Sequence, residues 1–172
     1  LIMQYNISPE TLQQESVEKG VDHYLKNPAK ESEYAVAANG SQYRKDFRGV
    51  FPSIMEDFYN QRKIAKKEML QAQQLYENEN DPRQLKVISS KNNYQMGMKI
   101  ALNSAYGALG NQYFRYFDLK MAEAITTSGQ LSIRWIHDRM NDYLNKIIGT
   151  KDEDYIIAVD TDSIYVTFEK LV

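Results

Sequence analysis

Apolar and polar residues alternate at helical spacing through most of the second half of the chain. Through residues 52–76, apolar side chains are separated by three or four residues, or by a small multiple of that spacing. Residues 83–106 form a second long segment, which mixes apolar and polar residues. The polar run 77–82, which ends in proline, separates the two segments, so we predict an antiparallel helical hairpin. Residues 119–148 form a third long segment that stops at Gly149, which predicts another helix.

Shorter patterns occupy the first 50 residues. The Ser-Pro-Glu run at positions 8–10 has a helix-capping serine, a proline suited to the first helical position and an acid in the first turn, so we predict a helix to about Gly20. Residues 34–38 and 41–44 favour β-strands, and Asn39-Gly40 between them favours a type I′ turn. The sequence therefore predicts a β-hairpin at residues 34–44.

A second hairpin is predicted around Asp160-Thr161-Asp162-Ser163, because β-branched and aromatic residues flank this polar tetrapeptide. Side chains alternate along a strand, so we expect Asp160 and Asp162 to point to the same side. Two close carboxylates repel each other unless a cation or a proton lies between them, and Mg²⁺ is a suitable cation for oxygen ligands. The alternative is a solvated turn, since Asp and Ser are common turn residues.

Composition narrows the function classes. The 172 residues are 42% hydrophobic and 26% charged, with a net charge of −2, so any nucleic-acid binding must depend on local basic clusters. No cysteine is present, which excludes disulfides and thiolate metal sites. No apolar run is long enough to span a membrane, and no membrane partner is expected. The first residue is not Met, and the pattern opens midway, which suggests a fragment of a longer protein.

Basic residues recur at helical spacing in both halves of the predicted helical hairpin. Arg62 and Lys66 are four residues apart and share a helix face, and so do Lys99 and Asn103. Three cations and an amide on neighbouring helices could clamp a polyanion such as a triphosphate. The alternative is that the basic run at 62–67 is a solvated helix face.

Tyr106 and Gly107 continue the face that carries Lys99 and Asn103. They could provide a flat surface against which a base pair rests, with glycine permitting close approach. The alternative is a helix end with an aromatic anchor and a glycine cap.

These motifs together resemble family B DNA polymerases over nearly the whole chain. Lys99-x-x-x-Asn103-Ser104-x-Tyr106-Gly107 is similar to the second signature motif of the family, and Asp160-Thr161-Asp162-Ser163 is similar to the third. The pattern Asn6-x-Ser8-Pro9-x-Thr11 resembles the segment after the first motif, and Lys45-Asp46-Phe47-x-Gly49-x-x-Pro52-Ser53 resembles the entry into the fingers helices. Residues 107–111, 114–119 and 124–127 resemble parts of T-even-like bacteriophage replicative polymerases.

The resemblance implies an α+β fold. It consists of helical-hairpin fingers and part of an antiparallel-sheet palm that carries a metal-binding β-hairpin. The implied domains are a partial palm at residues 1–50, fingers at 51–107 and palm at 108–172.

The resemblance also implies the roles of individual residues. Catalytic residues would be Asp160, Asp162 and Lys99, with both aspartates as metal ligands and Asp162 ligating both ions. The other implied roles are nucleotide binding by Arg62, Lys66, Lys99 and Asn103, and contact with the nascent base pair by Tyr106 and Gly107.

The implied activity is DNA-templated DNA synthesis, with transfer of a dNTP to a primer 3′-hydroxyl by a mechanism that uses two Mg²⁺ ions or Mn²⁺ as a substitute. Implied partners are primer–template DNA, dNTP and, in a full-length protein, a sliding clamp. The implied location is the cytoplasm of a bacterial host, for a protein encoded by a phage. We expect the isolated chain to be inactive, because the aspartate of the first motif and a thumb are missing, and we expect unpaired palm strands to favour self-association.

Two other functions remain open at this stage. One is a non-catalytic nucleotide- or DNA-binding module derived from a polymerase, and the other is an RNA-synthesising palm enzyme. Two departures from phage relatives bear on the choice: Val159 occupies a position where those relatives usually have glycine, and only 37 positions separate Lys66 from Asn103, which is short for T-even fingers.

Overall fold

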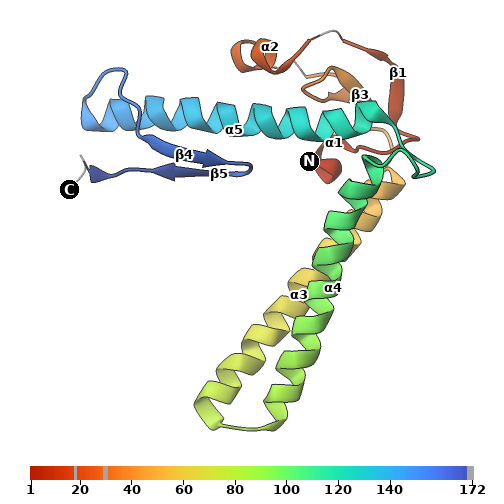
Figure 1. The fold of residues 1–172 in the computed structure, drawn as a ribbon, viewed down its shortest axis with the longest axis vertical. Helices are drawn as coiled ribbons and strands as arrows, with labels where there is room; N and C mark the ends of the chain where they lie inside the picture. Colours follow the sequence, from red (N-terminus) through yellow and green to blue (C-terminus); the bar gives the residue numbers. More distant parts are fainter. Residues whose placement is uncertain (18, 29–30, 170–172) are drawn as a thin grey trace.

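The computed structural model describes residues 1–17, 19–28 and 31–169 and has the shape of a bent arm (Figure 1). One long helix and two small sheets form the upper part, and a helical hairpin projects from one end of it. The elements in chain order are α1 (Ile2–Tyr5), β1 (Leu12–Ser16), α2 (Val21–Lys26), β2 (Tyr34–Val36), β3 (Ser41–Arg44), α3 (Val50–Glu79), α4 (Arg83–Leu109), α5 (Leu119–Ile148), β4 (Ile156–Asp160) and β5 (Ser163–Val166).

The predicted helical hairpin is confirmed as α3 and α4, which pack against each other along their length. Ala65 and Ala72 lie one heptad apart on α3 and are buried, because small side chains let the two helices approach closely. The second helix extends three residues beyond the predicted boundary at residue 106: α4 continues to Leu109, and Gly110 follows as its C-cap.

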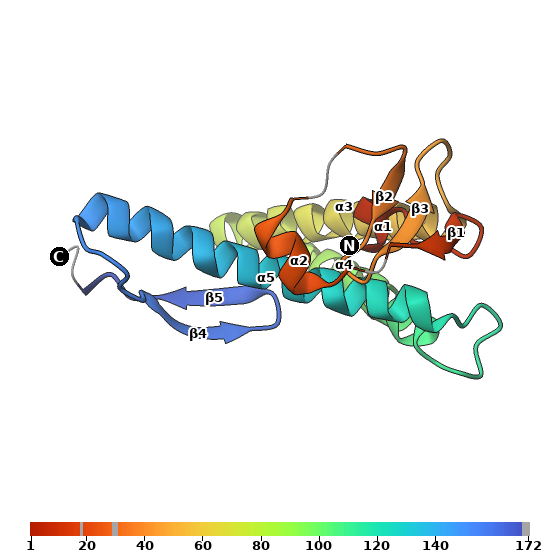
Figure 2. The ribbon, with the colours of Figure 1, turned by 90° about the horizontal axis from the view of Figure 1, so that it is seen from above.

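The third predicted helix is confirmed as α5, with the expected bounds. The Asp118 carboxylate accepts a hydrogen bond from the Lys120 N–H (2.8 Å) and caps the start, while Gly149 ends the helix in the left-handed region (φ 77°). Met121 and Ala124 on α5 belong to the buried core together with Ile2, Ile7, Ala37, Tyr43 and Leu109. Figure 2 shows α5 running past the sheet of β1, β2 and β3. Within the described ranges, no helix is both long and apolar enough to cross a bilayer.

The three-stranded antiparallel sheet has the order β1-β3-β2, so β1 and β2 are its edges. Its β2–β3 hairpin confirms the two predicted strands, although β2 ends at Val36 and not at residue 38. The predicted type I′ turn is wrong. Of the two central residues only Gly40 has a positive φ (83°), whereas a type I′ turn needs two. Gly40 is required there, because an added Cβ would collide with the Val17 carbonyl.

The helix predicted from Ser8 to about Gly20 is wrong, and β1 occupies the centre of that segment. The capping groups of this segment act on α3 instead. The Ser8 hydroxyl accepts a hydrogen bond from the Phe51 N–H (3.3 Å), and the Glu10 carboxylate accepts one from the Val50 N–H (2.5 Å). These contacts satisfy N–H groups in the first turn of α3, which lack partners within their own helix.

Asn6 completes the attachment of α3 to the sheet. Its buried side chain donates to the Arg44 and Phe47 carbonyls (2.7 and 2.8 Å) and accepts from the Gly49 N–H (2.9 Å). Gly49 must lack a side chain, because an added Cβ would lie 2.6 Å from the Ser8 Cβ. Residues 6–10 therefore fix the base of the helical hairpin on the rest of the fold.

Because of these contacts, we predict that Glu10 stabilises the folded state and that this stabilisation is lost in acid. Slight desolvation raises the pKa of the exposed carboxyl, but hydrogen bonds that include those from the Val50 N–H and the Ser8 hydroxyl outweigh that effect and hold the pKa below its usual 4.5. A carboxyl with a lowered pKa stabilises the folded state above its unfolded pKa, and this stabilisation is lost as the pH falls through the folded value. Glu10→Gln should lower the free energy of unfolding by about 0.5 kcal/mol at neutral pH, a small value because the group is exposed.

Urea unfolding at about pH 7 and about pH 3 measures this effect, with Glu15→Gln on β1 as the control. The difference between Glu10→Gln and the unmodified chain should disappear at the lower pH. An equal difference at both pH values would contradict the capping role.

Candidate active site

The helical hairpin presents the predicted phosphate-binding residues from both of its helices. Arg62 and Lys66 lie on α3, and Lys99 and Asn103 lie on α4. Arg62 is half-buried, whereas the other three side chains are exposed. Lys66 and Lys99 make no ion pair within the described part of the chain, so their charges are available to an anionic ligand.

Contacts between the helices set the register of these residues. The Arg62 Nε donates to the Gln95 Oε1 (3.4 Å), which places the two residues at the same level of the hairpin. Lys99 then lies one turn nearer the base and Lys66 one turn nearer the tip, each displaced by about 6 Å along the axis. Long, flexible side chains at that spacing can reach one polyphosphate together.

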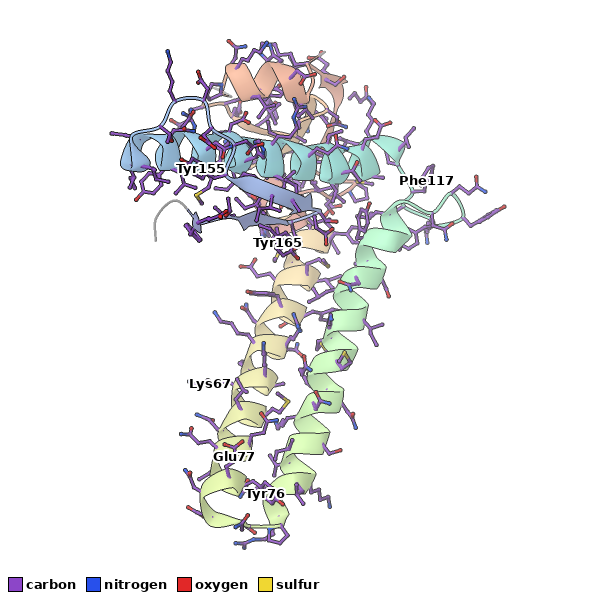
Figure 3. All side chains as sticks on the ribbon, turned by 60° about the vertical axis from the view of Figure 1, so that its left-hand side comes forward. Lys67, Tyr76, Glu77, Phe117, Tyr155 and Tyr165 are labelled. Atoms are coloured by element: carbon purple, nitrogen blue, oxygen red, sulfur yellow. The ribbon has the colours of Figure 1, made fainter. Side chains whose placement is uncertain are left out.

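The other two lysines of the basic run, Lys63 and Lys67, lie on a solvated helix face. Figure 3 shows Lys67 on the side of α3 that faces away from α4. Lys63 lies four residues earlier, so it shares this face. Elsewhere on the hairpin, Glu68 and Lys91 form an ion pair (2.6 Å) that joins the two helices. The basic run therefore divides between an outward face and the face that carries Arg62.

Tyr106 and Gly107 lie in the last turns of α4, at the base of the hairpin. The Tyr106 side chain is 42% exposed, and a Cβ added at Gly107 would meet no atom within 4 Å. Packing within this chain therefore does not require glycine at position 107. The position leaves room for a flat ligand surface, as the base-pair interpretation needs.

The predicted hairpin at Asp160-Thr161-Asp162-Ser163 forms from β4 and β5, with Asp160 paired to Ser163. Thr161 has a positive φ (45°), and the Asp162 N–H donates to the Asp160 carbonyl across it (2.5 Å), as in a γ-turn. Strand alternation does not apply across this turn, so the placement of Asp160 and Asp162 on the same side stays a prediction. Both aspartates are exposed.

Asparagine side chains on α5 fix the start of this hairpin. Asn141 donates to the Asp154 carboxylate (2.8 Å) and accepts from the Tyr155 N–H (2.9 Å), and Asn145 donates to the Glu153 carbonyl (2.7 Å). Hydrogen bonds from the Ile156 N–H and from Asn141, with the nearby His137, lower the pKa of Asp154, so its charge is maintained. The buried Tyr155 lies against α5 in Figure 3.

This anchoring directs the turn toward the middle of the molecule. β4 and β5 run alongside α5, and the turn points to the region where the helical hairpin begins (Figure 1). A cavity of about 730 Å³ opens beside the turn, with Thr161 and Asp162 in its lining. Trp135 and Ile136 of α5 also line this cavity.

The donor set at the turn partly fits a hard divalent cation. Aspartate oxygens are suitable ligands for Mg²⁺, and both carboxylates are exposed enough to bind it. In residues 1–17, 19–28 and 31–169, however, no three His, Cys, Asp or Glu side chains gather closely enough to hold a metal ion. Further ligands would have to come from water, from a bound phosphate or from another polypeptide segment.

Sequence reasoning missed several residues that position these groups. Gln95 was not singled out, although a glutamine four residues before Lys99 shares its helix face. Asn141 and Asn145 were also missed; their spacing of four residues near the end of α5 was the available signal.

Comparison with known proteins decides the family. A family model described as DNA polymerase family B matches residues 1–171. The chain belongs to DNA polymerase family B. Phage relatives agree: the chain is 34% identical over 215 residues to the DNA-directed DNA polymerases of Enterobacteria phage T4 and Escherichia phage RB69, with 100% of this chain covered. The resemblance to family B and to T-even-like polymerases is thus confirmed.

Coverage of the family B relatives is partial. The chain spans 24% of the length of each phage polymerase, and the aligned region of 215 residues is 43 longer than the 172 residues here. DNA polymerase 1 of Pyrococcus abyssi is 27% identical over 168 residues, which cover 97% of this chain and 18% of that protein. The structure of the family B DNA polymerase from Pyrobaculum calidifontis matches this chain with a TM-score of 0.58 and 24% identity, and the match covers 95% of this chain and 18% of that polymerase. This match supports the mixed helix-and-sheet fold.

Proposed function

We propose that this chain forms the fingers and part of the palm of a DNA-templated DNA polymerase that transfers a dNTP to a primer 3′-hydroxyl. Family membership supports the reaction class. The observation that carries the assignment is the position of two motifs: the Lys99–Gly107 segment ends at the base of the helical hairpin, and the aspartate turn points toward that base. The proposed domains are partial palm at 1–50, fingers at 51–107 and palm at 108–172.

The helical hairpin holds the triphosphate in this proposal. Arg62 contacts phosphate oxygens through its planar fork, while Lys66 and Lys99 contribute mobile positive charges and Asn103 a neutral amide. Lys99 also donates a proton to the leaving pyrophosphate. These groups favour the transition state, because negative charge on the phosphates grows as the bond to pyrophosphate breaks.

Tyr106 and Gly107 contact the nascent base pair. The exposed ring offers an apolar face, and the absent side chain at Gly107 lets the pair approach the helix backbone. The primer–template duplex then lies between the base of the fingers and the aspartate turn.

Asp162, with Asp160 in a lesser role, would hold divalent cations. Two Mg²⁺ ions, or Mn²⁺ in their place, supply the charge that activates the hydroxyl and stabilises the leaving group when they are bound. The protein's own contribution is the turn, which keeps both carboxylates exposed at the end of an anchored hairpin.

The 172 residues alone should not extend a primer. The two carboxylates of the turn have no third carboxylate, histidine or cysteine close enough in the described part of the chain to complete a metal site. Incubation of the isolated chain with primer–template, dNTP and Mg²⁺ should give no product. Any Mg²⁺-dependent extension would contradict this prediction.

A chimera tests the function itself. The 172 residues replace the matching 215-residue segment of the phage T4 polymerase, and primer extension is measured with Mg²⁺. Template-dependent synthesis is the expected result. A folded chimera that binds DNA but gives no synthesis would favour the non-catalytic module, and Val159 and the 43-residue difference would be the first features to restore.

Partners and location follow from the same proposal. Primer–template DNA and dNTP are the substrates, a sliding clamp is a partner of the full-length protein, and the site of action is the cytoplasm of an infected bacterial host.

A further inference from the structure

Gln95 is unusual among the buried residues of the helical hairpin. Its side chain is 8% exposed, and in the described residues of α3 and α4 it is the one polar residue that is buried. The other buried residues of the two helices are Pro52, Ala65, Ala72 and Leu109.

A buried amide is costly unless its oxygen and nitrogen both find partners. In Gln95 the Nε2 donates to the Asn92 Oδ1 (3.1 Å), and the Oε1 accepts from the Arg62 Nε (3.4 Å). An apolar side chain would fill the same space without needing these partners. The amide is therefore explained better by what it does to Arg62 than by packing.

The contact with Gln95 uses only one of the guanidinium nitrogens. Arg62 makes no other hydrogen bond or ion pair with the described residues, so both of its Nη groups remain available. An arginine side chain loses substantial rotamer freedom when it binds a phosphate. A hydrogen bond that already fixes the Nε removes part of that loss before the ligand arrives.

We propose that Gln95 is a positioning residue, which holds the Arg62 guanidinium so that its two Nη groups face an incoming triphosphate. This inference rests on the proposed function of the helical hairpin. Gln95 lies one turn from Lys99 on the same helix face, so the fixed guanidinium stands beside the charge of that lysine.

The test uses the 172-residue chain and inorganic tripolyphosphate as the probe. Binding is followed by NMR through the Nε–H signal of Arg62. Gln95→Met should move this signal in the free protein and weaken tripolyphosphate binding about tenfold, the usual size for a hydrogen bond to a charged group.

Gln61→Met is the matched control. Gln61 accepts a hydrogen bond from the Tyr94 hydroxyl (2.5 Å), so this variant also removes a polar contact between α3 and α4 but keeps the hydrogen bond between Arg62 and Gln95. Its tripolyphosphate affinity should stay within about twofold of the unmodified chain, since the contact that positions Arg62 is unchanged. Should Gln95→Met unfold the hairpin, Gln95→Asn keeps an amide that is too short to reach Arg62 and should show the same loss.

Two reference variants separate this inference from the proposed function. In an Arg62→Lys background, Gln95→Met should cause no further loss, because the group it positions is gone. If Arg62→Lys weakens binding but Gln95→Met does not, the positioning role is overturned and the proposed function stands. If neither Arg62→Lys nor Lys99→Ala weakens binding, or if the unmodified chain does not bind tripolyphosphate, the proposed function fails and the inference fails with it.

Discussion

Asp162→Ala in the polymerase chimera is expected to abolish Mg²⁺-dependent primer extension, with a loss of at least about a thousandfold. The carboxylate lies exposed at the turn between β4 and β5, where it would supply the negative charge that holds the cations. Removal of a metal ligand would weaken cation binding and so withdraw positive charge that stabilises the transition state. The fold should persist, because the Asp162 contact within the turn is made by its backbone N–H.

Asp142→Ala is the matched control for this measurement. Asp142 is an exposed carboxylate on α5, 3.7 Å from the Arg139 guanidinium, so the substitution changes the net charge equally at a distance from the turn. Asp160→Ala should cause an intermediate loss. A chimera that keeps more than about a tenth of its activity without the Asp162 carboxylate would contradict the metal-binding role.

Lys99→Ala should lower kcat/KM for dNTP about a hundredfold, because one positive charge beside the phosphates is lost. Lys99 is exposed on α4 and has no ion pair among the described residues, so this loss should occur without a change in stability. Steady-state kinetics of the chimera measure the effect, with Lys63→Ala on the outward face of α3 as the control.

Lys99→Arg separates charge from proton donation. Arginine keeps the positive charge but does not release a proton at working pH, so KM should recover while kcat stays low. Full recovery of kcat in this variant would contradict the role of Lys99 as the proton donor. An unchanged KM in Lys99→Ala would contradict its role in binding the phosphates.

The long helices were predictable because their signals are local. Spacing of apolar residues and clear breaks at Pro82 and Gly149 determined α3, α4 and α5 to within a few residues. Ser8 and Glu10 show where local reasoning fails. Both residue types are common at the start of a helix, but the hydrogen bonds that they accept come from N–H groups of α3, some 40 residues away in sequence.

In the candidate site, too, the arrangement within one helix was predictable, whereas the contacts between elements were not. Lys99, Asn103, Tyr106 and Gly107 share a face because one helix carries them, and the sequence is enough to place them together. The contact between Arg62 and Gln95 depends on how two helices pack, and no spacing within either helix reveals it. The positive φ of Thr161 likewise arises from the closing turn, and side-chain alternation along a strand does not describe the backbone there.

A structure of the chimera with primer–template DNA, a non-hydrolysable dNTP and Mg²⁺ would show whether the two motifs bind the triphosphate and the cations. We predict an ion about 2.1 Å from an Asp162 oxygen and a triphosphate in contact with Lys99 and the Arg62 guanidinium. A triphosphate bound away from α4, with no cation at the turn between β4 and β5, would contradict the assignment of this chain as the fingers and part of the palm of a DNA polymerase.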